Sequence, residues 1–198
     1  MSANGIDVFD KTLQTTNIWL DEIMEDLGPD RKTAWRVLAI VLQKLRNRLP
    51  VGLAANLGAQ LPILIRGIYY DQFRPEQLPV ECDTMEQFCA EVGEWLRDNR
   101  PVNPEQAVQS VFGLLSRHIS EGEIGNVVQA LPESIRKAWP QDARSRAKEQ
   151  MRESADAQQR FSEEQGFIAT DERKSDVQPA SAEEERTMAG GTAGGRTR

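Results

Sequence analysis

The sequence contains one helical pattern twice, seventy residues apart. Residues 37–70 align without a gap on residues 107–140. A Leu-Pro pair followed by Ile-Arg occupies residues 61–66 of the first copy and residues 131–136 of the second. Helical composition alone does not place these four residues at the same spacing twice, so the chain contains an internal repeat. Residues that both copies keep serve the common structure, whereas residues found in one copy only are candidates for function.

Apolar residues recur at spacings of three and four along most of the chain, and Gly and Pro separate the apolar segments. This pattern predicts an all-α fold. We expect helices at about residues 9–27, 31–49, 50–60, 63–70, 84–98, 104–119, 121–130 and 132–139. One copy buries its apolar face poorly alone, so we expect a single pseudo-symmetric helical bundle made of two tandem repeats.

The predicted domain organisation has three parts. A helical domain covers residues 1–140, with repeat one at about 9–71 and repeat two at about 84–140. Residues 141–165 contain strong helix formers but only a thin apolar stripe, which predicts a solvated helix whose stability depends on docking. Residues 166–198 are rich in Asp, Glu, Ser, Ala and Gly, and we expect this tail to be disordered.

Several polar residues have the positions of helix caps. Asp30, Asp83 and Asn103 each stand just before an expected helix. Ser120, followed three residues later by Glu123, is expected to form a capping box in which each side chain accepts a backbone N–H. These caps would place the helix starts.

The chain opens with Met-Ser-Ala-Asn-Gly, which lacks the basic and apolar segments of a signal peptide. Its most apolar runs, residues 37–42 and 61–65, are too short to cross a bilayer. We therefore expect a cytoplasmic protein without a membrane segment.

The sequence contains none of the common catalytic motifs, such as a glycine-rich phosphate loop, Gly-x-Ser-x-Gly or His-Glu-x-x-His. Cys82 and Cys89 have the spacing of neither a redox pair nor a zinc knuckle, so we expect reduced thiols with Cys89 packed inside. His118 is the only histidine, and no nucleophile is associated with it. We expect no catalytic residue, no metal and no cofactor, and we favour a protein that is not an enzyme.

The two copies differ in charge. Residues 31–70 contain seven basic residues and no Asp or Glu, whereas residues 101–140 contain three basic and four acidic residues. The core does not require this difference, which favours an anionic partner on repeat one. The candidate binding residues are Arg31, Lys32, Arg36, Lys44, Arg46 and Arg48. The partner would be an acidic protein surface or the chain's own acidic segment at residues 183–185. Nucleic acid is less favoured because the net charge is −7.

A simpler interpretation of these cations is internal. They would neutralise the acidic residues 21–26 of the first helix, or they would be solvated on the surface. Most charged runs in proteins have such a role, and we regard this alternative as the more common arrangement.

A second candidate site lies between the repeats, where pseudo-twofold folds often bind small molecules. Its residues would be Arg66, Tyr69, Tyr70 and Arg136. Arg66 matches Arg136 across the repeat, which indicates a structural guanidinium that holds a carbonyl or carboxylate. Gly67 is replaced by Lys137 in the second copy, so this glycine would permit the close approach of another backbone.

These motifs occur in the order found in a known family. The segments are residues 48–50, 59–70, 120–123, 131–133 and 139–140. Over about residues 9–140 the chain resembles the bacterial family called domain of unknown function 2267. The resemblance implies an all-helical fold with two related halves and a setting among bacterial stress-related proteins, and it brings no catalytic residues. Our leading hypothesis is a helical interaction or adaptor protein. The alternatives are a nucleic-acid or phosphate-binding protein, and an enzyme or small-ligand binder that uses the cleft.

Overall fold

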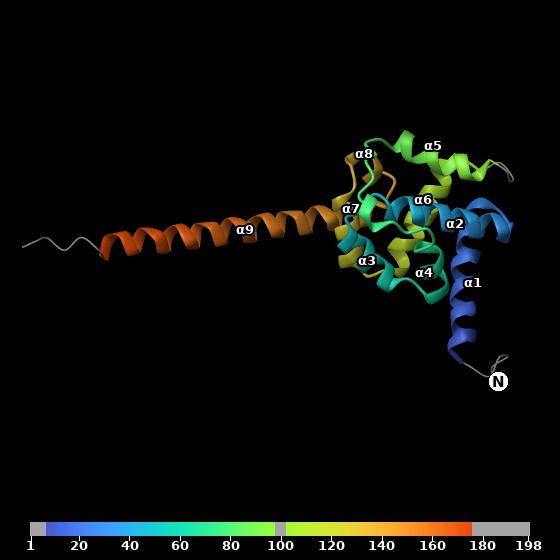
Figure 1. The fold of residues 1–198 in the computed structure, drawn as a ribbon, viewed down its shortest axis with the longest axis horizontal. Helices are drawn as coiled ribbons and strands as arrows, with labels where there is room; N and C mark the ends of the chain where they lie inside the picture. The colour runs from blue at the N-terminus through green and yellow to red at the C-terminus, as the bar shows by residue number, and fades with distance from the viewer. Residues whose placement is uncertain (1–6, 98–101, 176–198) are drawn as a thin grey trace, which may run out of the picture. The chain divides into compact units, whose positions relative to one another are not determined.

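A computed structural model describes residues 7–97 and 102–175, with side chains up to residue 160 (Figure 1). Every regular element in these ranges is a helix, which confirms the all-α prediction. The helices are α1 (Asp7–Leu27), α2 (Arg31–Arg46), α3 (Val51–Gln60), α4 (Ile63–Tyr69), a 3₁₀ helix (Pro75–Gln77), α5 (Met85–Leu96), α6 (Pro104–His118), α7 (Glu121–Ala130), α8 (Glu133–Arg136) and α9 (Gln141–Ser175). The chain divides into two units after Ala155, and the contacts below belong to the first unit.

Local sequence chemistry sets several helix ends as expected. Gly28 has a φ of 99° and stops α1, because this left-handed conformation favours glycine. Asp30 caps α2, where its carboxylate accepts the backbone N–H of Lys32 at 3.0 Å. Asn103 caps α6 in the same way. These three ends are therefore determined within a few residues of sequence.

Two expected caps are wrong. Thr84 caps α5 in place of Asp83, since its hydroxyl accepts the backbone N–H of Gln87 at 3.2 Å. Ser120 makes no side-chain cap on α7, and its own backbone N–H donates to Gln60 of α3 at 3.0 Å. The proximity of α3 explains the difference, because a side chain from the opposing helix takes the position that the capping box assigns to Glu123.

The helices pack in a reciprocal pattern. The pair α2 and α6 is in contact, α1 packs on both of them, and α5 packs on both of them as well. Likewise α3 contacts α7, while α1 contacts α4 as α5 contacts α8. Many of the fully buried side chains come from α2 and α6, and they include Val37, Leu38, Val41, Leu42, Leu45, Val108, Val111, Phe112 and Leu115. This exchange of contacts fits a two-repeat bundle, whose overall symmetry stays a prediction.

The start of α9 packs onto this core. The ring of Phe112 stacks on Trp139 at 4.3 Å, just before α9 begins. Ala143 and Ala147 of α9 are buried, whereas the side chains of residues 152–160 are exposed. The helix runs to Ser175 and so extends past the expected end at Gln165, into the tail predicted to be disordered from residue 166. The rest of that predicted tail, residues 176–198, lies outside the described residues.

None of the helices in the described ranges has the length and hydrophobicity that crossing a membrane requires.

Candidate functional site

Three of the six candidate cations of repeat one are engaged inside the protein. Lys44 and Arg48 both form ion pairs with Glu91 of α5, and the Lys44 Nζ lies 2.8 Å from a carboxylate oxygen of Glu91. Only 2% of the Arg48 side chain is exposed. Arg46 is buried, donates to the backbone carbonyls of Tyr69 and Asp71, and its pKa is lowered by burial. These three cations hold α5 and the segment after α4 against α2.

The other three cations lie at the start of α2. Arg31 pairs with Asp21 of α1 at 2.6 Å, on the surface. Lys32 and Arg36 are exposed, and neither forms an ion pair with another described residue. The six residues therefore do not form one binding face, because Lys44, Arg46 and Arg48 have internal partners.

Repeat two also contacts the acidic first helix, where Asp21 is paired by Arg31 of repeat one. Glu22 accepts hydrogen bonds from Arg117 at 2.9 Å and contacts His118 Nε2 at 2.5 Å. Partial burial alone would raise the pKa of Glu22, but the hydrogen bonds from His118 and Arg117 outweigh it and lower the pKa. Ser110 donates to Asp26 at 2.6 Å. His118 thus belongs to a polar cluster that joins α1 to α6.

Each of the four cleft candidates donates to backbone carbonyls, the three of repeat one to carbonyls of residues 54–61 and Arg136 to those of residues 129 and 131. Arg66 donates to the carbonyls of residues 59 and 61, and Arg136 donates to those of residues 129 and 131, which confirms the structural interpretation of both arginines. Tyr69 is buried and donates to the carbonyl of residue 54 at 2.8 Å, and burial raises its pKa. Tyr70 donates to the carbonyl of residue 55 at 3.4 Å. The structure does not bring these four side chains into one site.

The prediction for Gly67 is wrong. A Cβ at Gly67 would meet no atom within 4 Å, so no backbone approaches it closely. The close approach occurs at Gly58 of α3, where a Cβ would lie 2.3 Å from the hydroxyl oxygen of Tyr70. Gly58 is the glycine that packing requires, because the tyrosine ring occupies the space of its missing side chain.

The thiols also differ from expectation. Cys82 is the buried cysteine, and Cys89 is half-buried on α5 with its pKa raised by burial. Both thiols are free. Among the described residues, no three His, Cys, Asp or Glu side chains converge in a way that could hold a metal ion.

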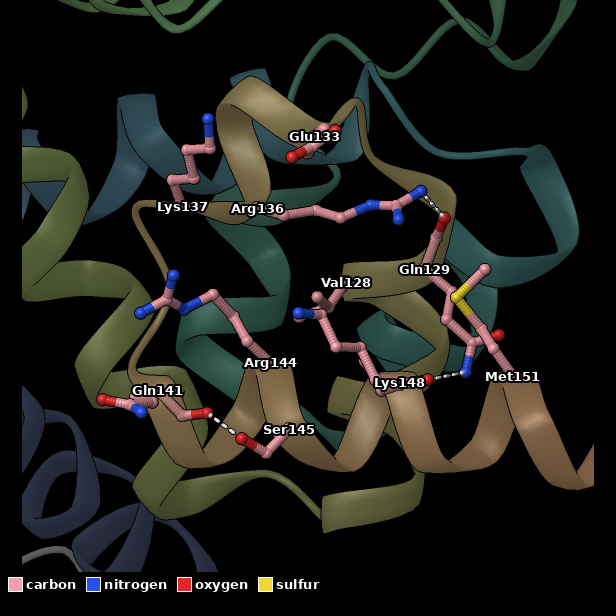
Figure 2. Close-up of a pocket in the computed structure, with 11 residues that line it drawn as sticks. Val128, Gln129, Glu133, Arg136, Lys137, Gln141, Arg144, Ser145, Lys148 and Met151 are labelled. Carbon is pink, nitrogen blue, oxygen red and sulfur yellow. Dashed lines mark hydrogen bonds between the residues drawn. The ribbon is translucent and has the colours of Figure 1, made fainter.

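A basic pocket of about 390 Å³ lies between α7, α8 and the start of α9 (Figure 2). Its charged lining consists of four cations, Arg136, Lys137, Arg144 and Lys148, and one carboxylate, Glu133. Its other lining residues are Val128, Gln129, Gln141, Ser145, Ala147 and Met151. We use the name basic pocket for this set of residues.

The cations of the basic pocket have no ion-pair partners among the described residues. In Figure 2, Arg144 and Lys148 extend from α9 toward α8, and Arg136 lies across the hollow from them. The Nε of Arg144 is buried and has no hydrogen-bond partner. By contrast Arg146, on another face of α9, pairs with Glu121 at 3.1 Å. The pocket therefore gathers positive charge that the protein itself does not neutralise.

Helix α9 is held in place beside the pocket by α7. Gln129 donates through its side-chain nitrogen to the carbonyl of Ala147 at 3.1 Å and to the Gln150 side chain at 3.2 Å. Gly125 of α7 lets Gln150 approach, since a Cβ there would lie 1.8 Å from the Gln150 side-chain oxygen. These contacts place Arg144 and Lys148 opposite α8.

Sequence reasoning missed the basic pocket because repeat two is slightly acidic as a whole. The pocket takes its cations from two segments, and one of them lies beyond the repeat. The available signal was the spacing of Arg144 and Lys148, four residues apart and on one face of a helix.

One known protein family matches most of the described helices. The family model described as "Uncharacterized conserved protein (DUF2267)" matches residues 16–138. The match includes α2 to α8 and ends before α9, so the α9 side of the basic pocket lies outside it. A search of curated proteins finds no match. Because the family model spans more than half of the sequence, the chain belongs to the DUF2267 family.

Proposed function

We propose that this protein is a helical binding module for a small anionic ligand, which the basic pocket holds. One observation carries the proposal. The lining of one hollow includes the half-buried Arg136 and Arg144, the exposed Lys137 and Lys148, and a single carboxylate, Glu133. None of the four cations has an ion-pair partner in the described chain. Like charges in one hollow repel each other, and a bound anion relieves that repulsion.

The volume of the basic pocket suits a small-molecule ligand. A volume of about 390 Å³ lies within the range of roughly 300–1,000 Å³ that is usual for small-ligand sites. Val128, Ala147 and Met151 supply an apolar part of the wall, and Gln129 supplies an amide. Such a lining suits a ligand with one charged end and an organic body.

Calorimetric titration with a panel of small anions tests this function. We expect binding that Arg144→Gln and Lys148→Gln each weaken about tenfold, because each removes one cation from the pocket. Arg152→Gln is the matched control, since Arg152 is exposed on the same helix and does not line the pocket. If no anion binds, or if all three variants behave alike, the proposed function is wrong.

A second candidate function is an adaptor role in the cytoplasm, with an acidic protein as partner. It is supported by Lys32 and Arg36, which are exposed and form no ion pair in the described chain, beside the surface residue Arg31. Capture of a partner at low salt by the wild type, and its loss in the Lys32→Glu/Arg36→Glu variant, would support this role. Equal capture by both proteins would exclude it.

The same capture experiment separates two other partners. The affinity for a nucleic-acid partner would fall steeply as the salt concentration rises, because the release of counterions drives such binding. A chain that ends at Gln165 lacks the acidic residues 183–185, and increased capture by this shorter chain would support competition from the chain's own tail.

A further inference from the structure

We infer that the basic pocket binds the phosphate group of a small phosphate monoester. This inference rests on the proposed function of the pocket as an anion site, and it narrows the anion to one chemical class. The first argument is charge. The lining contains four cations and one carboxylate, so a ligand with a single carboxylate leaves most of the excess positive charge unbalanced. A phosphate monoester carries about −1.5 to −2 at pH 7 and balances more of it.

The second argument is the direction of the donors. Arg144 and Lys148 extend toward the hollow from α9, and Arg136 of α8 lies across from them, whereas the exposed Lys137 points away from α9 (Figure 2). A carboxylate is planar and is matched by one arginine fork. A phosphate group has three terminal oxygens that point in different directions, so donors from two facing helices can reach it together.

The third argument is the state of the two guanidiniums. Arg136 is fixed by its hydrogen bonds to the backbone carbonyls of Gln129 and Leu131, which occupy its Nε and Nη2 and leave Nη1 available. The Nε of Arg144 is buried without a partner. The guanidinium of Arg136 is thus held in position by the protein before a ligand binds, whereas the buried Nε of Arg144 is reached from the hollow only if its side chain moves. Donors that are placed before binding give a ligand affinity at a low entropic cost.

The fourth argument concerns the rest of the ligand. Val128, Ala147 and Met151 form an apolar part of the lining beside the cations. Free phosphate has nothing to place against this surface, whereas the organic body of a monoester does. The pocket therefore fits a small monoester better than inorganic phosphate.

Titration calorimetry of the full chain with four probes tests the assignment. The probes are ribose 5-phosphate, inorganic phosphate, sulfate and acetate. We expect ribose 5-phosphate to bind most tightly and acetate at least tenfold more weakly. Arg144→Gln and Lys148→Gln should each weaken ribose 5-phosphate about tenfold. Arg152→Gln should leave its affinity unchanged, because Arg152 lies outside the pocket lining.

The dependence on pH identifies the dianion. The charged groups that line the hollow are Glu133, Arg136 and Lys137 from α8 and its end, and Arg144 and Lys148 from α9, while α7 contributes none. No histidine lines the pocket, so the side chain that usually titrates between pH 5 and 8 is missing from the lining. Ribose 5-phosphate should bind about tenfold more weakly at pH 5 than at pH 7.5, because its second pKa is about 6. Sulfate is a dianion at both values and should not change.

The outcomes separate this inference from the function on which it rests. Acetate binding as tightly as ribose 5-phosphate would overturn the phosphate assignment and leave the anion-binding function intact. If sulfate binding showed the same pH dependence, a group of the protein and not the ligand would be titrating, which would also contradict the phosphate assignment. Vesicles containing phosphatidate that bind where ribose 5-phosphate does not would exclude a small-molecule ligand. If none of the four probes binds, both the inference and the proposed function fail.

Discussion

Arg66 and Arg136, seventy residues apart, bind corresponding backbone carbonyls at the ends of two helices, Arg66 through Nη2 alone and Arg136 through Nε and Nη2. Each guanidinium donates to the backbone carbonyls of the residues five and seven positions before it. The distances are 2.9 and 2.6 Å for Arg66, and 2.5 and 2.7 Å for Arg136. The last carbonyls of a helix have no partner within that helix. The two arginines satisfy them at the ends of α3 and α7, and so fix the Leu-Pro turn that follows each helix.

Removing either guanidinium should therefore destabilise the fold by a similar amount. We expect Arg66→Met and Arg136→Met each to lower the free energy of unfolding by about 1–3 kcal/mol, because each leaves two carbonyls without a charged donor. Urea denaturation measures this quantity. Arg152→Met, on the exposed part of α9, is the control and should change it by less than about 0.5 kcal/mol. A loss at only one of the two arginines would show that the copies are not equivalent.

Helix ends and turns could be predicted from the sequence because their chemistry is local. Gly28 stops α1 and Asp30 caps α2 through bonds that span two to four residues. The same holds for the turn between α3 and α4. The capping box at Ser120 failed because its competitor, Gln60, comes from a helix sixty residues away. Propensity describes a segment alone, whereas packing decides between partners.

The partners of the repeat-one cations could not be predicted from the sequence for the same reason. Arg46 and Arg48 look like surface cations in the sequence, but their partners lie 23 to 43 residues further along the chain. Only the fold shows that these partners are close. The basic pocket was harder still to predict from the sequence, because Arg136 and Lys148 line one pocket only when α9 packs beside α8. Charge counted along the chain therefore pointed to repeat one, whereas the unpaired cations of the pocket lie in repeat two and beyond it.

Glu91 should be important for stability, because it is the partner of two cations. Glu91→Gln leaves Arg48, whose side chain is 2% exposed, and Lys44 without a charged partner. We expect a loss of about 1–3 kcal/mol in the free energy of unfolding. Glu94→Gln on the same helix is the matched control, since Glu94 is exposed, and it should have almost no effect. Combining Glu91→Gln with Arg48→Met should cost less than the sum of the two single changes. Additive losses would contradict the pairing.

The cluster around Glu22 should make stability depend on pH. Hydrogen bonds from His118 and Arg117 outweigh the effect of burial and lower the pKa of Glu22 in the folded state. A lowered carboxyl pKa stabilises the fold above the unfolded pKa of about 4.3, and this contribution is lost as the pH falls through the folded pKa. Glu22→Gln should therefore be less stable than the wild type by up to about 1 kcal/mol at pH 7.

The same comparison at low pH completes this test. Urea denaturation at pH 3 should give a smaller difference between Glu22→Gln and the wild type than at pH 7. Glu25→Gln is the control, because Glu25 is exposed on the same helix, and it should follow the wild type at both values. A difference for Glu22→Gln that is equally large at both pH values would show that the effect is steric.

Two glycines of repeat one should respond to alanine with opposite signs. Gly58→Ala places a Cβ 2.3 Å from the hydroxyl oxygen of Tyr70, whose ring is held edge-on by Tyr69 and Phe73. We expect a loss of about 1–3 kcal/mol in the free energy of unfolding, because the ring must move. Gly67→Ala meets open space on α4 and should gain about 0.5–1 kcal/mol, since alanine favours the helix. Thermal and urea denaturation of both variants compare the two effects directly, and a gain at Gly58 would exclude the packing of Tyr70 against it.

Glu123 is the position where the repeat itself suggests a stabilising change. Repeat one has Leu53 there, whereas Glu123 is 9% exposed and its Oε1 has no partner. Burial raises the pKa of Glu123, so the folded state binds its proton more tightly than the unfolded state does. A raised carboxyl pKa lowers stability as the pH rises from the unfolded pKa of about 4.3 through the folded pKa.

Replacing Glu123 by the residue of the other copy removes this penalty. We expect Glu123→Leu to be more stable than the wild type by about 1 kcal/mol at pH 7, because a buried carboxyl oxygen without a partner is lost and apolar surface is gained. The gain should shrink at pH 3, where the wild-type carboxyl is protonated in both states. Urea denaturation at the two pH values measures both effects. A variant less stable than the wild type at pH 7 would mean that Glu123 has a partner in solution and that α7 needs its charge.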